Sequence, residues 1–368
     1  MVVELQGVTK RYDRSTAVED ISFTVSRGEF VTLLGPSGSG KTTLLNLIVG
    51  KVAPTAGKII INGQDATHLE PGKRDIGMVF QNYALMPHMT VFENVAFPLQ
   101  IRKLPKQEIA KRVNKQLEAV GLLQFADRHP RQLSGGQQQR VSLARCLVYN
   151  PSLILMDEPL GALDRNMREQ MQLEIRRLHA DTGVTILYVT HDQEEALTMS
   201  DQIILMNHGK IEQKATPDEL YRKPVSVFAA QFLGDSNLFA GEVEDTGNIV
   251  SIRGLNGIRL QGRIEQPAVR GDSGHMLVRP ENLTIKAEKI DGPNCLEGIC
   301  EDSILLGGVV KHRIRLPGSK EVVVQELNRD TSPRIRHGDA TWVSWRAEDA
   351  LFIPSDKTPA PAPTAELQ

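Results

Sequence analysis

Hydrophobic and polar positions alternate along the chain in two patterns, and the change falls near residue 236. In the first part, short apolar runs alternate with segments whose apolar residues recur at helical spacing, which predicts strands connected by helices. The runs predicted to be strands are 2–6, 21–25, 30–34, 58–61, 76–80, 153–156, 184–189, 203–206 and 211–214. Strands that alternate with helices predict an α/β fold with a doubly wound parallel sheet.

Capping residues and glycines mark several helix ends. The segments predicted to be helices are 42–49, 105–120, 137–148, 168–179 and 193–199, with another that opens at Pro217. Residues with the spacing of a capping box form three pairs: Ser134 with Gln137, Asp192 with Glu195, and Thr216 with Glu219. Gly50 and Gly121 follow two of these segments, as helix-ending glycines do. Residues 88–150 interrupt the strand pattern, so we expect a helical insertion there.

The second part consists of short alternating segments broken by Gly, Asn and Pro, which predicts an all-β, barrel-like domain over 237–354. The first domain is then expected to span 1–235. The stretch 278–283 resembles the stretch 345–350, which indicates either two related half-barrels or a chance similarity. Residues 355–368 are rich in Pro, Ala and Thr and are expected to form a disordered tail.

Composition sets limits on the class of protein. A length of 368 residues favours two domains, and a formal net charge of −2 argues against a nucleic-acid partner. Three cysteines without C-x-x-C spacing fit a reducing compartment and no zinc site; Cys295 and Cys300 could pair, but small core or loop residues are the simpler interpretation. We find no signal peptide and no apolar run long enough to span a membrane, so any membrane contact is expected through a partner.

The stretch from residue 35 to residue 42 fits the phosphate-loop pattern G-x-x-x-x-G-K-[ST] and lies between a predicted strand and a predicted helix. Its residues, with the one that follows, are Gly35, Pro36, Ser37, Gly38, Ser39, Gly40, Lys41, Thr42 and Thr43. Glycines let backbone N–H groups turn toward a phosphate chain, and the helix N-terminus adds partial positive charge. Lys41 can reach the terminal phosphates, and the Thr42 hydroxyl can hold Mg²⁺. A chance glycine-rich turn is the alternative.

A second motif narrows the class of nucleotide hydrolase. Leu133-Ser134-Gly135-Gly136-Gln137 is the LSGGQ signature of the ATP-binding-cassette (ABC) family, and residues 1–235 resemble that family. Leu160-Gly161-Ala162-Leu163-Asp164 resembles its D-loop, with Gly161 where the family most often has Ser. The resemblance implies ATP as the nucleotide and Mg²⁺ as its metal.

The family pattern also assigns carboxylate roles. Asp157 and Glu158 follow the predicted strand 153–156 and resemble the Walker B pair. Asp157, at the end of a buried strand, would hold Mg²⁺ together with Thr42, because this cation prefers oxygen ligands. Glu158 would polarise the water that attacks the γ-phosphate. The alternative for Glu158 is an ordinary surface carboxylate.

Three further residues occupy family positions. Gln81 matches the Q-loop, whose glutamine binds magnesium or water and senses the transmembrane partner; it could also be a plain loop amide. His191 follows a predicted strand, at the sheet edge where ligands bind, and matches the switch histidine that contacts the γ-phosphate; a buried structural histidine is the alternative. Tyr12 matches the adenine-stacking aromatic, or is a packing residue.

In the family, the signature of one copy completes the site of another, so two ATP molecules are buried between two chains. The resemblance therefore implies a homodimer in which Ser134, Gly135, Gly136, Gln137 and Asp164 contact the partner's nucleotide. It also implies two permease subunits and, indirectly, a periplasmic or extracellular solute-binding protein. Such a chain would lie on the cytoplasmic face of the cell membrane.

The second domain resembles the transport-associated OB (TOBE) domain of bacterial import ATPases. Val278-Arg279-Pro280-Glu281-Asn282 carries this resemblance, and the stretch 343–351 is most similar to spermidine/putrescine importers. Import of ferric iron, 2-aminoethylphosphonate or a sugar remains an alternative. A soluble ABC ATPase outside transport is a further one, and it usually carries arm insertions or two cassettes. The domain is expected to regulate or to extend the dimer contact.

Overall fold

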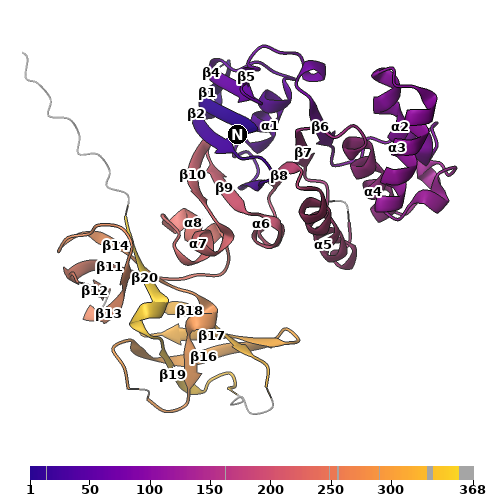
Figure 1. Cartoon of the computed structure of the whole chain (residues 1–368). Helices are drawn as coiled ribbons and strands as arrows, with labels where there is room; N and C mark the ends of the chain where they lie inside the picture. The colour runs from indigo at the N-terminus through magenta and orange to yellow at the C-terminus, as the bar shows by residue number, and fades with distance from the viewer. Residues whose placement is uncertain are drawn as a thin grey trace, which may run out of the picture. The chain divides into compact units, whose positions relative to one another are not determined.

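The computed structural model describes residues 1–13, 15–161, 163–247, 249–254, 257–289, 291–329 and 335–355 (Figure 1). It divides into two compact units, Met1–Leu220 and Tyr221–Gln368. The division falls earlier in the chain than the expected boundary at 235. The physical reason is helix α8 (Val227–Phe232), whose Ala230 packs against Leu277, Leu351 and Ile353 of the C-terminal unit.

The first unit is built on a six-stranded sheet in the order β10-β9-β3-β8-β7-β6. All neighbours are parallel except β10 with β9. The strands are β3 (Phe30–Leu34), β6 (Ile76–Val79), β7 (Leu153–Asp157), β8 (Thr185–Thr190), β9 (Gln202–Asn207) and β10 (Lys210–Ala215). The predicted doubly wound parallel sheet is confirmed. Strands β3 and β8 are buried along their whole length, as their continuous apolar sequence predicts.

The remaining strands of this unit form a second sheet, which is antiparallel, has the order β2-β1-β4-β5 and includes β5, which was not predicted. They are β1 (Val3–Tyr12), β2 (Ser15–Val25), β4 (Ala56–Ile61) and β5 (Gln64–Asp65). Helix α1 (Lys41–Val49) shares one hydrophobic core with both sheets. The start of α1 is thereby fixed between two rigid layers.

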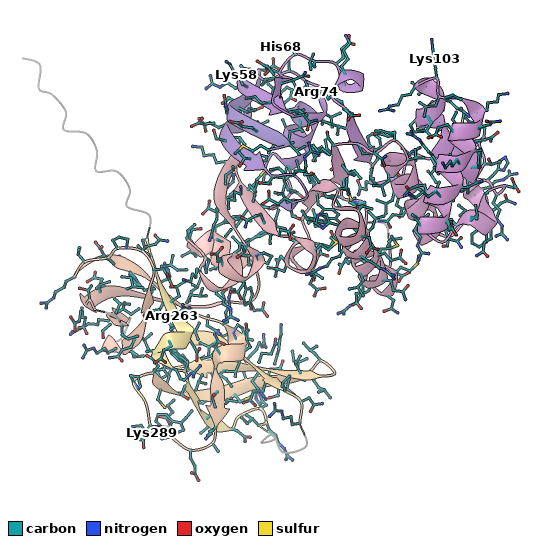
Figure 2. The ribbon with its side chains drawn as sticks, viewed as in Figure 1. Lys58, His68, Arg74, Lys103, Arg263 and Lys289 are labelled. Carbon is teal, nitrogen blue, oxygen red and sulfur yellow. The ribbon has the colours of Figure 1, made fainter. Side chains whose placement is uncertain are left out.

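The C-terminal end of α1 is held by a buried arginine (Figure 2). Arg74 follows the short 3₁₀ helix η1 (Pro71–Lys73) and donates to the carbonyl oxygens of Leu47 and Ile48, both at 2.8 Å. Burial lowers the pKa of this guanidinium from its ordinary value. Gly50 ends the helix in the left-handed region, where an added Cβ would lie 2.5 Å from Arg74 Nε.

The helical insertion expected over 88–150 is present, with a core of its own. Its helices are α2 (Val91–Ile101), α3 (Lys106–Ala119) and α4 (Gly135–Leu147), with 3₁₀ turns η2 (Leu123–Phe125) and η3 (Pro130–Gln132). Helix α2 was not predicted, because it contains Pro98 and a nearly continuous apolar run. Thr90 and Glu93 form a complete capping box at its start.

The other helices of this unit are α5 (Arg165–Thr182), α6 (Gln193–Met199) and α7 (Pro217–Arg222), whose last residues enter the second unit. The capping boxes predicted at Ser134 and Thr216 are both formed. The box predicted at Asp192 is wrong in one half. Asp192 accepts from the N–H groups of Glu194 and Glu195, but the Glu195 carboxylate accepts from Tyr188 and Thr190 instead of returning to the cap.

The C-terminal unit contains a closed barrel, β11-β12-β13-β20-β14, and a five-stranded sheet, β15-β19-β16-β17-β18. Its strands are β11 (Asn237–Asp245), β12 (Ile249–Gly254), β13 (Arg259–Ile264), β14 (Ser273–Val278), β15 (Thr284–Lys286), β16 (Cys295–Leu305), β17 (Val309–Leu316), β18 (Lys320–Leu327), β19 (Ala340–Ser344) and β20 (Ala350–Pro354). One hydrophobic core joins the barrel and the sheet. The predicted all-β architecture is confirmed.

The two similar stretches of this unit are its two crossings between barrel and sheet. Strand β14 leads through the 3₁₀ turn η5 (Pro280–Asn282) into β15, and β19 leads through η6 (Ala347–Asp349) into β20. Because β14 pairs with β20 and β15 with β19, the crossings run antiparallel side by side. The similar stretches therefore occupy equivalent turns between the barrel and the sheet.

All three cysteines are free thiols, and Cys295 and Cys300 lie on the same strand, β16. Of the helices that the structure describes, none is both long and apolar enough to cross a membrane. The expected disordered tail falls almost entirely on residues 356–368, which lie outside the described part.

Candidate nucleotide site

The phosphate loop connects β3 to α1. At two of its glycines, neighbouring atoms fill the space that a side chain would need. A Cβ on Gly35 would lie 2.4 Å from the carbonyl oxygen of Met206. A Cβ on Gly40 would lie 2.6 Å from that of Ala17, and its φ of +100° disfavours any side chain. The loop can therefore bring its backbone close to neighbouring strands and to a ligand.

The start of α1 is open to an anion. Its N-cap is Gly40, and within the described structure no side chain caps the first turn. The free N–H groups and the helix dipole point into a cavity of about 390 Å³ lined by Ala17, residues 37–43 and Glu158. The buried Ser39 hydroxyl has no partner among the described residues. This cradle fits a phosphate chain.

The side chain of Lys41 is bound to the backbone of the phosphate loop. Its side chain is buried, and Nζ donates to the carbonyl oxygens of Gly35 at 2.6 Å and Pro36 at 2.9 Å. Burial lowers the pKa of Lys41, while the nearby charges of Glu158 and Asp157 act in the opposite direction. A phosphate group arriving in the loop would give this ammonium a stronger, charged acceptor.

The two carboxylates at the end of β7 have different surroundings. Burial, and then the charge of Glu158, raise the pKa of Asp157. Glu158 has a φ of +44°, a strained conformation for a non-glycine residue, and its N–H donates to Val189 O at 3.0 Å. This turn places Glu158 in the lining of the cavity, with Oε1 3.1 Å from Nδ1 of His191. Two residues predicted to act in catalysis are therefore in contact.

An arginine that the sequence did not reveal joins this edge of the sheet to the D-loop. Arg168, on α5, donates from Nη2 to Leu163 O at 3.3 Å and from Nη1 to Asp192 Oδ2 at 3.1 Å. Its Nε lies 4.0 Å from the buried carboxylate of Glu195. Asp192 directly follows His191, so Arg168 positions the histidine segment against the D-loop. The partners are far apart in sequence, and no spacing rule could have found them.

Gln81 and Tyr12 lie outside the described lining of the cavity. Gln81 is exposed, and its Nε2 would be 3.5 Å from a Cβ on Gly161 of the D-loop. Tyr12 ends β1 with 44% of its surface exposed and with Lys10 Nζ 5.0 Å from its ring centroid. Their predicted contacts with magnesium and adenine remain predictions.

The signature residues pack on the D-loop of their own chain. An added Cβ on Gly135 would lie 3.3 Å from Leu163, and one on Gly136 would lie 2.9 Å from Met167. Asp164 caps α5 by accepting from Met167 N at 2.9 Å. Ala162, within the D-loop, lies outside the described residues. Among the described residues that line the phosphate cavity, none comes from 133–137 or from 160–164. The signature and the phosphate loop thus form two separate surfaces of one chain.

The donor set suits magnesium rather than a metal held by protein alone. No cluster of three His, Cys, Asp or Glu side chains that could hold a metal occurs in the described parts of the chain. Thr42 lines the cavity, and Asp157 ends the strand beside it. One hydroxyl and one carboxylate, with the remaining positions left to water and phosphate oxygens, match the way Mg²⁺ binds in nucleotide sites.

Comparisons with known proteins agree with this geometry. A family model described as ABC transporter matches residues 18–161, and one described as TOBE domain matches residues 276–353. The chain belongs to the ABC transporter family, in the class of its ATP-hydrolysing subunits. Among curated relatives, it is 44% identical to the "Spermidine/putrescine import ATP-binding protein PotA" of Rubrobacter xylanophilus, over 96% of this chain and 94% of that protein. It is also 44% identical to the protein of that name from Thermobifida fusca, over 96% and 93%.

Two solved structures resemble the first unit. One is the ATP-binding cassette MJ0796 in a dimeric post-hydrolysis state with ADP and Pi, with 37% identity, a TM-score of 0.52, and coverage of 58% of this chain and 98% of that one. The other is cbiO1 from Clostridium perfringens, part of the ABC transporter complex cbiONQ, with 28% identity, a TM-score of 0.57, and coverage of 63% and 92%. The predicted family and fold class are confirmed.

Proposed function

We propose that this chain is the ATP-hydrolysing subunit of a membrane complex that imports polyamines. The observation that carries the substrate class is the 44% identity, along nearly the whole of both chains, to proteins named for spermidine and putrescine import. The likeness includes the C-terminal unit, because the match covers 96% of this chain. The cargo itself need never touch this subunit.

The active form we propose is a homodimer that buries two ATP molecules. The separation of the phosphate cavity from the described residues of 133–137 supports it, because one chain offers only half of the donors a closed site needs. The related cassette MJ0796 is dimeric in a post-hydrolysis state with ADP and Pi, which supports a dimeric form. Ser134, Gly135, Gly136, Gln137 and Asp164 would then face the nucleotide held by the partner.

In this dimer, Glu158 accepts a proton from the water that attacks the γ-phosphorus. The bond from that phosphorus to the bridging oxygen breaks, and ADP and phosphate leave. His191, 3.1 Å from the Glu158 carboxylate, orients it, and its other ring nitrogen is the candidate donor to the γ-phosphate. Lys41 and the N–H groups of the loop stabilise the charge on the phosphate oxygens.

Mg²⁺ would be held by Thr42, Asp157 and, in the closed state, Gln81. When bound, it would neutralise charge on the phosphates of the nucleotide. Gln81 reaches this position only if its loop moves toward the cavity. That movement offers a physical link between a partner and the chemistry.

A groove of about 530 Å³ beside the same loop is the proposed contact with the permease. Phe80 and Ala84, which precede and follow Gln81 in the chain, line it, and Ile101, 63% exposed, lines it from α2. Arg145 donates to Ala84 O at 2.7 Å and Tyr83 O at 2.8 Å, so it ties this loop to α4. An apolar permease segment seated here would pull on the loop that carries Gln81 and on the signature helix together.

We therefore infer a peripheral position on the cytoplasmic face of the membrane, with the solute-binding protein acting only through the permease. The test is to purify the chain with the permease subunits that accompany it from the membrane fraction and to measure ATP hydrolysis in vesicles with candidate solutes. Stimulation by spermidine or putrescine is expected. Stimulation by ferric iron, 2-aminoethylphosphonate or a sugar instead would contradict the polyamine assignment.

The Glu158→Gln variant is the matched control for this assay. It removes the base while keeping the size of the side chain, so ATP binding is retained and hydrolysis falls about 10²- to 10⁴-fold with every solute. Wild-type turnover in this variant would show that the base assignment is wrong, whichever solute is transported.

A further inference from the structure

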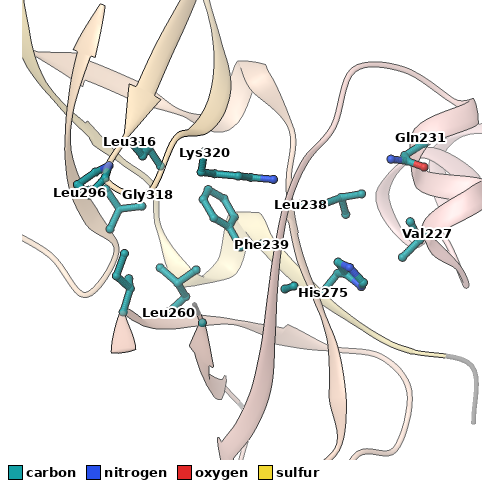
Figure 3. A pocket seen from close by; sticks show the side chains of 14 residues that line it. Val227, Gln231, Leu238, Phe239, Leu260, His275, Leu296, Leu316, Gly318 and Lys320 are labelled. Carbon is teal, nitrogen blue, oxygen red and sulfur yellow. The ribbon is translucent and has the colours of Figure 1, made fainter. Parts of the chain in front are cut away.

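The C-terminal unit contains a cavity of about 470 Å³ that the nucleotide chemistry does not use (Figure 3). Its wall is mostly apolar and comes from β11, β12, β13, β14, β16, β17, β18 and helix α8. The apolar side chains that line it include Leu238, Phe239, Ile258, Leu260, Leu296 and Leu316. This volume lies in the range of small-molecule sites in proteins.

The charge on the wall of this cavity has one sign. Lys320 extends over the ring of Phe239, with Nζ 5.8 Å from the ring centroid, and His275 lies on the neighbouring strand (Figure 3). None of the described lining residues is Asp or Glu, and Lys320 forms no ion pair with a described carboxylate. The ammonium therefore has room for an anionic partner.

His275 adds a polar group without adding positive charge. Burial, and then the charge of Lys320, lower the pKa of His275 and so favour its neutral form. Its Nδ1 is buried and has no hydrogen-bond partner among the described residues. A ligand that reaches this side of the cavity would find a neutral ring that can donate or accept.

We propose that the cavity binds a small amphipathic anion, with an apolar body among Leu260, Leu296 and Leu316 and a carboxylate or similar head at Lys320. Lys320 is the exposed first residue of β18, so it would hold the head where water can reach it. A polyamine is disfavoured, because its ammonium groups would meet Lys320 with no described carboxylate to offset the repulsion. The cavity is thus a site for a ligand other than the proposed cargo.

The protein carries its own reporter for this cavity. Phe239 lines it and stacks on Trp345, with ring centroids 5.2 Å apart. The chain has two tryptophans, so Trp342→Phe leaves Trp345 as the single emitter. A molecule that enters the cavity against Phe239 should change the Trp345 emission.

The test uses three probes with the same alkyl chain, added to the full-length Trp342→Phe protein without ATP. Octanoate, octanol and octylammonium differ only in the charge of the head group. We expect a saturable change in emission with octanoate and weaker binding of octanol. The affinity for octylammonium should be lower than that for octanoate by about tenfold or more. Spermidine should produce no change.

Two lysines provide a matched pair of variants. Lys320→Met should lower the affinity for octanoate by roughly three- to tenfold and leave the affinity for octanol unchanged. Lys289→Met is the control, because Lys289 lies over an aromatic ring of the same unit, 5.5 Å from the Trp342 centroid, but outside the described cavity lining (Figure 2). The Lys289→Met variant should bind all three probes with unchanged affinity.

A third variant tests the location itself. Ala240→Phe adds a ring at a lining position on β11 and should weaken octanoate and octanol together. The proposal is overturned if octanoate does not bind, if octylammonium binds as well as octanoate, or if Lys320→Met and Lys289→Met behave alike. Because neither ATP nor permease is present, these outcomes are independent of the proposed transport function.

Discussion

Helices α1 and α4 both begin at glycine-rich sequence, yet their N-termini are built in opposite ways. Helix α1 begins at Gly40 with no side-chain cap among the described residues, and its first turn faces the phosphate cavity. Helix α4 begins at Ser134, whose hydroxyl accepts a hydrogen bond from Gln137 N at 3.3 Å. In return, the side-chain oxygen of Gln137 accepts a hydrogen bond from Ser134 N at 3.0 Å. The first-turn N–H groups of α1 are left for a ligand, whereas side chains of the same helix start cap the first turn of α4.

The difference shows how a single chain can be stable with half of a site. A capped helix start needs no anion, so the signature can remain exposed in the free chain without cost. An uncapped start leaves N–H groups and a buried lysine that gain most when phosphate arrives. Nucleotide is thus expected to bind first at α1, and in the proposed dimer the signature of a second copy would join it afterwards.

The largest expected effect comes from changing the charge of the signature cap while keeping the cap. Asp is as good an N-cap as Ser, and a negative charge at a helix start is stabilising. Ser134→Asp should therefore leave the free energy of unfolding unchanged or raise it by up to about 1 kcal/mol. ATP hydrolysis should fall by about a hundredfold or more, because in the proposed dimer the added carboxylate would face the partner's phosphates.

Ser134→Asn is the matched control for this prediction. It has nearly the same shape and capping ability without the charge. Denaturant unfolding and steady-state ATPase assays of the two variants separate cap from charge. Equal activity in the two variants would mean that this helix start never meets a phosphate.

Two glycines of the phosphate loop give the next effect. Gly40→Ala places a methyl group 2.6 Å from a backbone oxygen, whereas a Cβ on Gly38 meets nothing within 4 Å. Both have positive φ. We expect Gly40→Ala to cost about 2–4 kcal/mol of stability and Gly38→Ala about 1 kcal/mol. Unfolding followed by circular dichroism checks this, and equal losses would contradict the packing around Gly40.

Sequence alone predicted the elements whose signal is local. Strand β7 and helix α6 were predicted because a continuous apolar run and a helical period each lie within a few residues. The phosphate loop was predicted for the same reason, since backbone recognition of phosphate needs glycines at fixed spacing. Helix α2 was missed because Pro98 and its continuous apolar run conceal the period.

The contacts that join distant segments could not be predicted. Arg168 meets Asp192 and a D-loop carbonyl only after the sheet has assembled. The cavity at Lys320 draws its wall from several strands and one short helix, with no spacing to detect. The capping box at Asp192 failed for a related reason, because the strand residues Tyr188 and Thr190 compete for the Glu195 carboxylate.

The smallest expected effect is on the pH dependence of stability. It tests whether Tyr188 and Thr190 hold the Glu195 carboxylate in a buried position. Burial raises the pKa of Glu195 in the folded chain above its unfolded value of about 4.3. The folded chain then holds this proton more tightly, so the stability linked to Glu195 is lost as pH rises through the folded pKa. Glu195→Gln should gain melting temperature relative to wild type as pH rises from about 4 toward neutrality. A difference that is constant or declines with pH would contradict the burial of an ionised Glu195.

The central claim, that each ATP site takes residues from two copies, is tested most directly by mixing two inactive variants. Lys41→Met disables the phosphate loop, and Ser134→Asp disables the signature, so a mixed dimer contains one intact site. We predict that single-turnover hydrolysis, negligible for either variant alone, recovers in the mixture to roughly a quarter of wild type, as random pairing in a two-fold dimer requires. A mixture as inactive as its two parents would contradict the account.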